Sequence, residues 1–214
     1  MRVGSKHITR HATLSHGVGA FMAGAAAVLT LPPFSMLALV PAAYGALFLL
    51  VRDRIPLVAG AMGWLFGLGY FGFGLSWIAE SFQIDAERFG ALAIPAVAGL
   101  SALLALFPAL AMALFILLCR SRLVGGVVAS FLFAACWAGA EWLRGHVLTG
   151  FPWNLAAYAL ADFDALRQPA AWLGSYGLSF LVILASVLLA QAILARGASR
   201  WLTLLFFALV VGGL

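Results

Sequence analysis

Long apolar segments separated by short polar turns follow one another along the whole chain. A helix that crosses the ~30 Å hydrocarbon core of a bilayer needs ~20 mainly apolar residues, and six of the segments meet or approach this length while a seventh begins. The pattern therefore predicts an all-α membrane protein, a polytopic transmembrane helix bundle with six full spans and a truncated seventh. The predicted spans run from about Ala12 to Leu31, Phe34 to Val51, Ile55 to Ala79, Gly90 to Cys119, Leu123 to Leu143 and Ala170 to Ala195, and the seventh begins at Trp201.

The last predicted helix is too short to cross a membrane. Trp201 to Leu214 gives fourteen residues, which is about 21 Å of helix at ~1.5 Å per residue. A helix that ended there would leave polar backbone groups inside the bilayer. We therefore expect the sequence to be the front of a longer protein, whose next part would lie outside the cytoplasm.

Composition narrows the class of protein. Of the 214 residues, 65% are hydrophobic and 9% are charged, and the mean hydropathy is +1.10. A water-soluble domain of this size would not need so much apolar sequence to fill one core. The basic side chains are not clustered with aromatic ones on a soluble face, so no nucleic-acid partner is expected.

The basic residues indicate how the predicted helices are oriented. If the spans alternate, nine of the twelve Lys and Arg side chains lie on one side, and the positive-inside rule makes that side, with the N-terminus, cytoplasmic. Residues 1–11 then form a basic cytoplasmic tail before a bundle over residues 12–214, and polar loops at 80–89 and 144–169 face the exterior. The nine are Arg2, Lys6, Arg10, Arg52, Arg54, Arg120, Arg122, Arg196 and Arg200.

The segment EWLRGHVLTGFPWN, residues 141–154, places charge at the exterior end of a predicted span, where charge is usually functional. Glu141 and Arg144 share a helix face, so they can form an ion pair that holds the end of the span. Alternatively they position a polar headgroup or an attached domain, since the fork of Arg144 suits a phosphate. The following turn would end the helix and put aromatic rings at headgroup depth; it comprises Gly150, Phe151, Pro152 and Trp153.

The third predicted span, up to Trp77, is rich in glycine and in aromatic residues. Gly63 and Gly67 form a small-xxx-small pair that allows close approach of a neighbouring helix, and packing alone would explain the composition. Alternatively, the aromatic side chains line a groove for lipid chains, with Tyr70 beside it and Trp77 at the exterior interface.

The residues predict no catalytic centre, metal site or cofactor. A nucleophilic enzyme needs its nucleophile beside a base in a wet site, whereas Cys119 and Cys136 both lie within apolar segments. His146, alone near the interface, is expected to be a hydrogen-bonded bystander. The N-terminal histidines lack neighbouring carboxylates or cysteines and are expected to belong to a polar interfacial segment; they are His7, His11 and His16.

Three blocks of sequence together resemble a known family. EWLRGHVLTGFPWN, with GWLFGLGYFGFGLSWI upstream and the early LPPFSMLALVPAAYGALFLL, is similar to the membrane part of the apolipoprotein N-acyltransferases, which are bacterial inner-membrane enzymes. The resemblance follows the same order over nearly the whole chain. Its most specific part is the pattern E-[WF]-L-R-G followed by L-T-G-[FY]-P-W.

The resemblance implies an eight-helix bundle with an extracytoplasmic nitrilase-like domain between the seventh and eighth helices, here expected after residue 214. Such enzymes take an acyl chain from a membrane phospholipid as a cysteine thioester and pass it to the α-amino group of a diacylglyceryl lipoprotein. Their Glu, Lys and Cys triad belongs to the hydrolase domain and has no matching position in this sequence. This chain, expected to be a monomer, would bind and position lipid and would not catalyse alone.

The resemblance also implies roles for the residues singled out above. Glu141, Arg144 and the turn from Gly150 to Trp153 would form a platform beneath the active site, while Tyr70 and Trp77 would flank the route by which lipid arrives. The alternative is a non-catalytic polytopic membrane protein, such as a small transporter or an assembly factor. Transporters usually place charged or broken-helix sites near the midplane, often in repeated halves, whereas here the charges lie at helix ends.

Overall fold

The computed structural model describes residues 5–120 and 126–212, with side chains from Ser15 onward. These residues are helical or irregular and include no strand, which confirms the all-α class. Part of the predicted cytoplasmic side lies outside the described residues: Arg2 and Arg122 are not described, nor are the side chains of Lys6, His7, Arg10 and His11.

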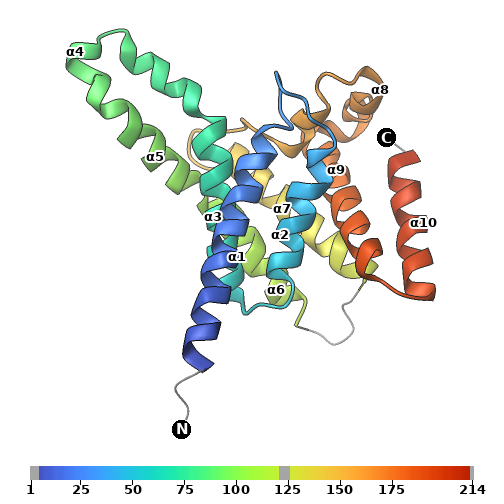
Figure 1. Ribbon diagram of the computed structural model, residues 1–214. Coiled ribbons are helices and arrows are strands. Elements are labelled where there is room, and N and C mark those ends of the chain that lie inside the picture. The colour runs from blue at the N-terminus through green and yellow to red at the C-terminus, as the bar shows by residue number, and fades with distance from the viewer. Residues whose placement is uncertain (1–4, 121–125, 213–214) are drawn as a thin grey trace.

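The helices follow one another along the chain with short connections (Figure 1). The α-helices are labelled α and the 3-10 helices η. They are α1 (Ser5–Val28), α2 (Leu39–Val51), α3 (Pro56–Gly74), η1 (Ser76–Gln83), α4 (Ala86–Phe89), η2 (Gly90–Leu92), α5 (Ala93–Leu104), α6 (Leu106–Leu118), α7 (Val127–His146), η3 (Ala156–Leu160), α8 (Asp164–Arg167), α9 (Ala170–Leu194) and α10 (Ala198–Gly212).

Each of the seven predicted apolar segments contains a helix, but the helices differ in length. Four helical segments are long and apolar enough to cross a membrane, and the apolar parts of α1, α2 and α10 are shorter. The expected count of six full spans and a truncated seventh is therefore not confirmed. The four are Pro56–Gly74, Ala86–Leu118, Val127–His146 and Ala170–Leu194.

The turn between α1 and α2 is longer than the sequence pattern predicted. Pro32 and Pro33 lack a backbone N–H and interrupt the helix, and Ser35 adopts a left-handed backbone with a φ of 48°. The backbone N–H of Met36 then donates to the Leu29 carbonyl at 3.0 Å, which closes the turn. The irregular segment therefore occupies residues that were expected to begin the second span.

Helix α3 lies between α1 and α6 and approaches both through glycines. A methyl group at Gly69 would meet the backbone carbonyl of Phe21 in α1, and a methyl group at Gly63 or Gly67 would come within 2.5 or 2.7 Å of the backbone of the α6 segment. No side chain fits at such distances. The Gly63 and Gly67 pair thus serves helix packing, as the packing interpretation predicted.

Two aromatic clusters hold α2 against its neighbours. Tyr44, Phe66 and Trp137 are buried, and their ring centroids lie 5.1 to 5.6 Å apart. Such tilted and edge-on contacts contribute about 0.5–1.5 kcal/mol each beyond the area they bury. A second cluster closes the α2, α6 and α7 junction with Phe48, Phe115 and Phe133.

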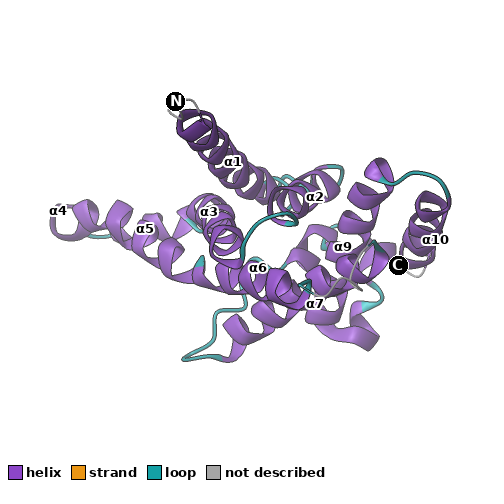
Figure 2. Ribbon diagram, turned by 90° about the horizontal axis from the view of Figure 1, so that it is seen from below, coloured by secondary structure: helices purple, strands orange, loops and turns teal. Residues whose placement is uncertain are grey.

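Helices α4 and α5 form an arm that projects from the rest of the bundle in both ribbon views (Figures 1 and 2). The arm contacts α3 and η1 and continues into α6, which it also contacts. It leaves large apolar side chains exposed, among them Ile84, Leu92 and Ile94. Such an apolar surface suits contact with lipid.

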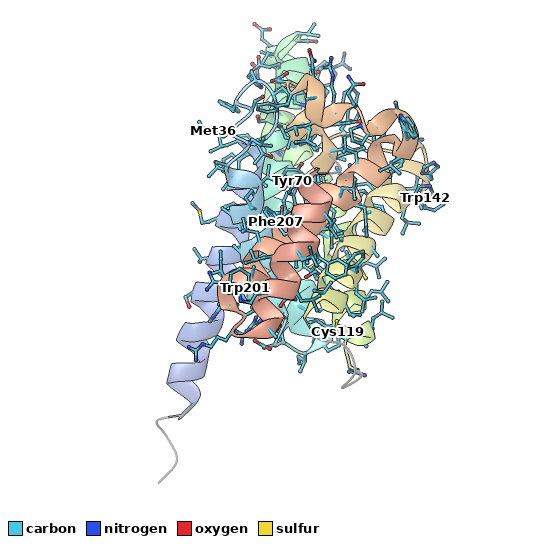
Figure 3. The ribbon with its side chains drawn as sticks, turned by 90° about the vertical axis from the view of Figure 1, so that its right-hand side faces the viewer. Met36, Tyr70, Cys119, Trp142, Trp201 and Phe207 are labelled. Carbon is cyan, nitrogen blue, oxygen red and sulfur yellow. The ribbon has the colours of Figure 1, made fainter. Side chains whose placement is uncertain are left out.

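The connections alternate between the two ends of the bundle. Cys119 and Trp201 lie toward the end where α1 begins, and Met36 lies toward the other (Figure 3). At the Met36 end, the Ser35 hydroxyl donates a hydrogen bond to the Asp162 carboxylate, which joins the α1–α2 turn to the loop before α8. The loop that follows α7 lies at this second end too (Figure 1).

We expect Gly69→Ala to destabilise the protein, because the added methyl group would press on the α1 backbone. Overpacking of this kind costs about 1–3 kcal/mol, and it would appear as a lower midpoint of thermal unfolding in detergent. Gly72 lies on the same helix, and a methyl group there would meet nothing within 4 Å, so Gly72→Ala is the matched control and should unfold at or slightly above the wild-type temperature. Equal unfolding midpoints for the two variants would contradict the close packing of α1 and α3.

Candidate functional site

The candidate site lies where α7 ends and the chain turns back toward the bundle. Helix α7 stops at His146, and three residues after it adopt left-handed conformations, with φ of 58° at Leu148, 73° at Gly150 and 53° at Asn154. A side chain at Gly150 would meet the Gly145 carbonyl, so only glycine fits this turn without displacement. The turn returns Phe151 to the helix end.

Arg144 is buried, at 3% exposure, and its guanidinium binds the backbone of this returning loop. Its Nη1 donates to the backbone carbonyls of Phe151 and Trp153, each at 2.6 Å, and its Nη2 donates to the Asn154 carbonyl at 3.4 Å. The guanidinium carbon also lies 5.0 Å from the centre of the Phe71 ring, a cation–π distance. The donors of Arg144 thus serve the loop backbone, which leaves the guanidinium facing the protein and not a headgroup.

Glu141 lies one turn earlier on α7 and is buried at 4% exposure. Its Oε1 accepts hydrogen bonds from the Trp137 indole N–H at 3.0 Å and from the backbone N–H of Ala156 at 2.9 Å. The second of these bonds fixes the first residue of η3. Glu141 therefore holds the far end of the loop that Arg144 holds near its start.

The sequence left open whether Glu141 and Arg144 form an ion pair. Within the part of the chain that the structure describes, no ion pair joins them; the two ion pairs found there are both at exposed positions and involve Arg52 and Arg167. The two charges instead act on different parts of one loop. They still share a buried environment, so their opposite charges offset one another.

Tyr70 and Asn154 complete the support of the loop. The Tyr70 ring is 1% exposed, it lies among the helices rather than at the edge of the bundle (Figure 3), and its hydroxyl donates to the Asn154 carbonyl at 3.1 Å. This burial differs from the expected position of Tyr70 beside a lipid groove. Asn154 was not among the expected site residues, although a polar residue after an aromatic turn is a fair signal for a left-handed position.

The outer side of the same loop is aromatic. The rings of Trp77 and Trp153 meet edge to face with centroids 6.1 Å apart, and each side chain is 55% exposed. Of the expected turn residues, Phe151 packs partly against the core, and the Pro152 carbonyl accepts a hydrogen bond from the Tyr158 hydroxyl at 3.2 Å. Partial burial raises the pKa of Tyr158 above its ordinary value.

Neither the histidine nor the cysteines form a reactive cluster. His146 Nδ1 lies 2.7 Å from the Trp142 carbonyl, and its ring stacks on Trp142 with centroids 4.5 Å apart; Figure 3 shows Trp142 at the outer edge of the bundle. His146 is thus hydrogen-bonded, as expected. The described residues contain no group of three or more His, Cys, Asp or Glu side chains placed to hold a metal ion.

Together these contacts make a supported loop rather than a reacting centre. Two buried charged side chains and one buried tyrosine bind its backbone from inside, and two tryptophans face outward from it and from η1. Such an arrangement can fix an apolar, aromatic surface at the end of a helix bundle. It offers no nucleophile beside a general base within the described residues.

Comparison with known proteins gives the same assignment throughout. Residues 23–188 match the family model described as the apolipoprotein N-acyltransferase N-terminal domain. The chain is 40% identical over 167 residues to a Caulobacter vibrioides protein named apolipoprotein N-acyltransferase, covering 77% of this chain and 31% of that protein. Proteins of the same name from Brucella melitensis and Nitrosomonas europaea are 40% and 38% identical over 191 and 192 residues, covering 84% and 87% of this chain and 35% and 37% of those proteins.

The chain therefore spans about a third of the length of the relatives it matches. The matched region includes every residue of the supported loop and the helix ends that hold it. On the breadth of this match, the chain belongs to the apolipoprotein N-acyltransferase family, as its N-terminal domain.

Proposed function

We propose that this chain is the lipid-binding membrane domain of an apolipoprotein N-acyltransferase. In this proposal an acyl chain passes from a membrane phospholipid to the N-terminal diacylglyceryl cysteine of a lipoprotein, and a nitrilase-like part of the longer protein supplies the reacting groups. The domain sits in the bacterial inner membrane as a monomer with its N-terminus in the cytoplasm. The observation that carries the proposal is the loop held by buried hydrogen bonds with tryptophans on its outer side.

The tryptophan pair would mark where lipid reaches the domain. Trp77 and Trp153 come from segments far apart in the chain and meet at the end of the bundle where the loop lies. Tryptophan favours the headgroup region because its ring is apolar and its indole N–H is polar. The pair would therefore contact a phospholipid near its headgroup.

A groove beside Trp77 would take an acyl chain. It has a volume of about 410 Å³ and lies between α1, α3, η1 and α5, and Ser76 and Ala79 of η1, on either side of Trp77 in the sequence, help to line it. Its walls are mainly apolar, and Phe21 and Phe73 are among them. An acyl chain in this groove would remain in a hydrocarbon-like environment while its ester end stayed near the tryptophans.

The supported loop would act as the platform for this lipid and for the reacting part of the enzyme. Arg144 is a positioning residue in this proposal, since its donors bind the carbonyls of Phe151 and Trp153. Glu141 and Tyr70 act in the same way on Ala156 and Asn154. The small-transporter alternative gains no support, because the two buried charges are bound to a loop at a helix end.

A chimera tests the overall proposal. When residues 1–214 replace the matching N-terminal part of the Caulobacter vibrioides relative, the chimera should N-acylate a diacylglyceryl lipoprotein in membranes depleted of the native enzyme. The chain alone should bind a fluorescent phospholipid and give no N-acylated product. Product from the chain alone would show that the chemistry lies in residues assigned here to support, and a folded but inactive chimera would count against the family function.

Replacing Arg144 tests the platform. In the chimera, Arg144→Ala should lower the free energy of unfolding by about 3 kcal/mol, because three hydrogen bonds to loop carbonyls are lost, two of them at 2.6 Å. The kcat/KM for N-acylation should fall roughly tenfold or more. Arg144→Lys should recover part of the stability at most, since an ammonium cannot reproduce the fork.

The control for this variant is Arg167→Ala. Arg167 pairs with Asp164 at an exposed position, where an ion pair contributes little, so its removal should leave both measurements near wild type. Wild-type activity in Arg144→Ala would remove the platform from the proposal.

Removing one tryptophan tests lipid contact. Trp153→Ala and Trp77→Ala should each raise the KM for phospholipid about fivefold in the chimera, which corresponds to the loss of about 1 kcal/mol of aromatic contact. The measurement is the initial N-acylation rate against phospholipid mole fraction. Trp172 is 91% exposed, and Trp172→Ala should leave this KM unchanged; equal KM values in all three variants would refute a specific role for the pair.

A further inference from the structure

A small cavity lies directly under the loop and is separate from the groove assigned to lipid. It has a volume of about 10 Å³ and is lined by residues of α3, α6 and α7 and by Asn154. A single water molecule needs a cavity of roughly 10–15 Å³, so this one is the size of one water and too small for any larger ligand. Its lining residues include Tyr70, Glu141 and Arg144.

Two of the residues that line this cavity each carry a polar atom with no hydrogen-bond partner among the described residues. One is Oε2 of Glu141 and the other is Nδ2 of Asn154. The two side chains are 4% and 9% exposed, so bulk solvent does not satisfy them. A buried polar atom without a partner costs about 1–3 kcal/mol, which makes two such atoms beside one cavity unusual in a packed interior.

The hydrogen-bonding groups of Glu141 and Asn154 determine which kind of ligand could satisfy both residues. The carboxylate oxygen of Glu141 can only accept a hydrogen bond, and the amide nitrogen of Asn154 can only donate one. A ligand that meets both must donate and accept. The charges of Glu141 and Arg144 are of opposite sign and line the same cavity, so neither a cation nor an anion is favoured, and the ligand is neutral.

We infer that this cavity binds a single water molecule, which donates a hydrogen bond to Glu141 Oε2 and accepts one from Asn154 Nδ2. The water would join α7 to the end of the loop, at the point where Arg144 and Tyr70 already bind the Asn154 carbonyl. This site is independent of the proposed acyl transfer, because it concerns how the loop is held.

The sequence offers an unusually clean probe of this site. Asn154 is the only asparagine in the 214 residues, so a chain labelled with [¹⁵N]asparagine has one side-chain amide signal. In the chain reconstituted in lipid nanodiscs, NMR magnetisation transfer from water protons to this amide should be strong. A soluble paramagnetic gadolinium chelate, which reaches only surface water, should leave the transfer intact.

A glycine pair on α3 provides variants. A methyl group at Gly74 would collide with Asn154 Nδ2, whereas a methyl group at Gly72 meets nothing within 4 Å. Gly74→Ala should therefore displace the amide and abolish the transfer from water, while Gly72→Ala should keep the wild-type signal.

The wild-type experiment alone can overturn the inference. Absence of transfer in the wild-type chain would show that the amide and the carboxylate are satisfied without water. Transfer that the gadolinium chelate removes would show surface hydration and would equally refute a buried site. These outcomes do not depend on whether Gly74→Ala folds, and none of them requires N-acylation activity.

Discussion

The hydrogen bonds from the buried Arg144 guanidinium to the loop carbonyls are the interaction on which the rest of the site depends. A charged side chain placed inside a helix bundle is costly unless its donors are satisfied, and irregular backbone that is buried is costly unless its carbonyls find donors. Here Nη1 of Arg144 donates hydrogen bonds to the Phe151 and Trp153 carbonyls, each at 2.6 Å, so the buried charge and the loop backbone satisfy one another. Neither the charge nor the loop would be stable in this place alone.

Glu141 extends the same principle to the other end of the loop and balances the charge. Its Oε1 accepts a hydrogen bond from the backbone N–H of Ala156, where η3 begins. One turn of α7 therefore carries both Arg144, which donates to loop carbonyls, and Glu141, which accepts from a loop N–H. The loop backbone has both carbonyl and N–H groups to satisfy; Arg144 binds the carbonyls and Glu141 binds the N–H.

The sequence predicted the helices well and the loop poorly, for a physical reason in each case. Apolar length and helix-breaking residues are local properties, so each of the seven predicted segments contains a helix. The count of six full spans is not confirmed, the fourth predicted span is divided into α5 and α6, and the start of α2 after the two prolines was misplaced. The partners of Arg144 are backbone carbonyls seven to ten residues away. Their position depends on three left-handed residues, and although Gly150 and Asn154 are of types that favour this conformation, Leu148 is not. The sequence also could not predict that Tyr70 faces the interior of the bundle, because α3 is apolar on every side and its pattern does not distinguish a buried face from an exposed one.

Trp153 shows why support from inside and contact on the outside belong together. Its carbonyl is bound by Arg144, while more than half of its side chain is exposed and meets Trp77. A tryptophan on a freely moving loop would lose conformational entropy on contacting lipid, and that loss would weaken binding. Under the proposed function, fixing the backbone of the residue whose ring faces outward would remove part of this cost before lipid binds, so that the buried Arg144 would strengthen lipid contact at a surface that it does not itself touch.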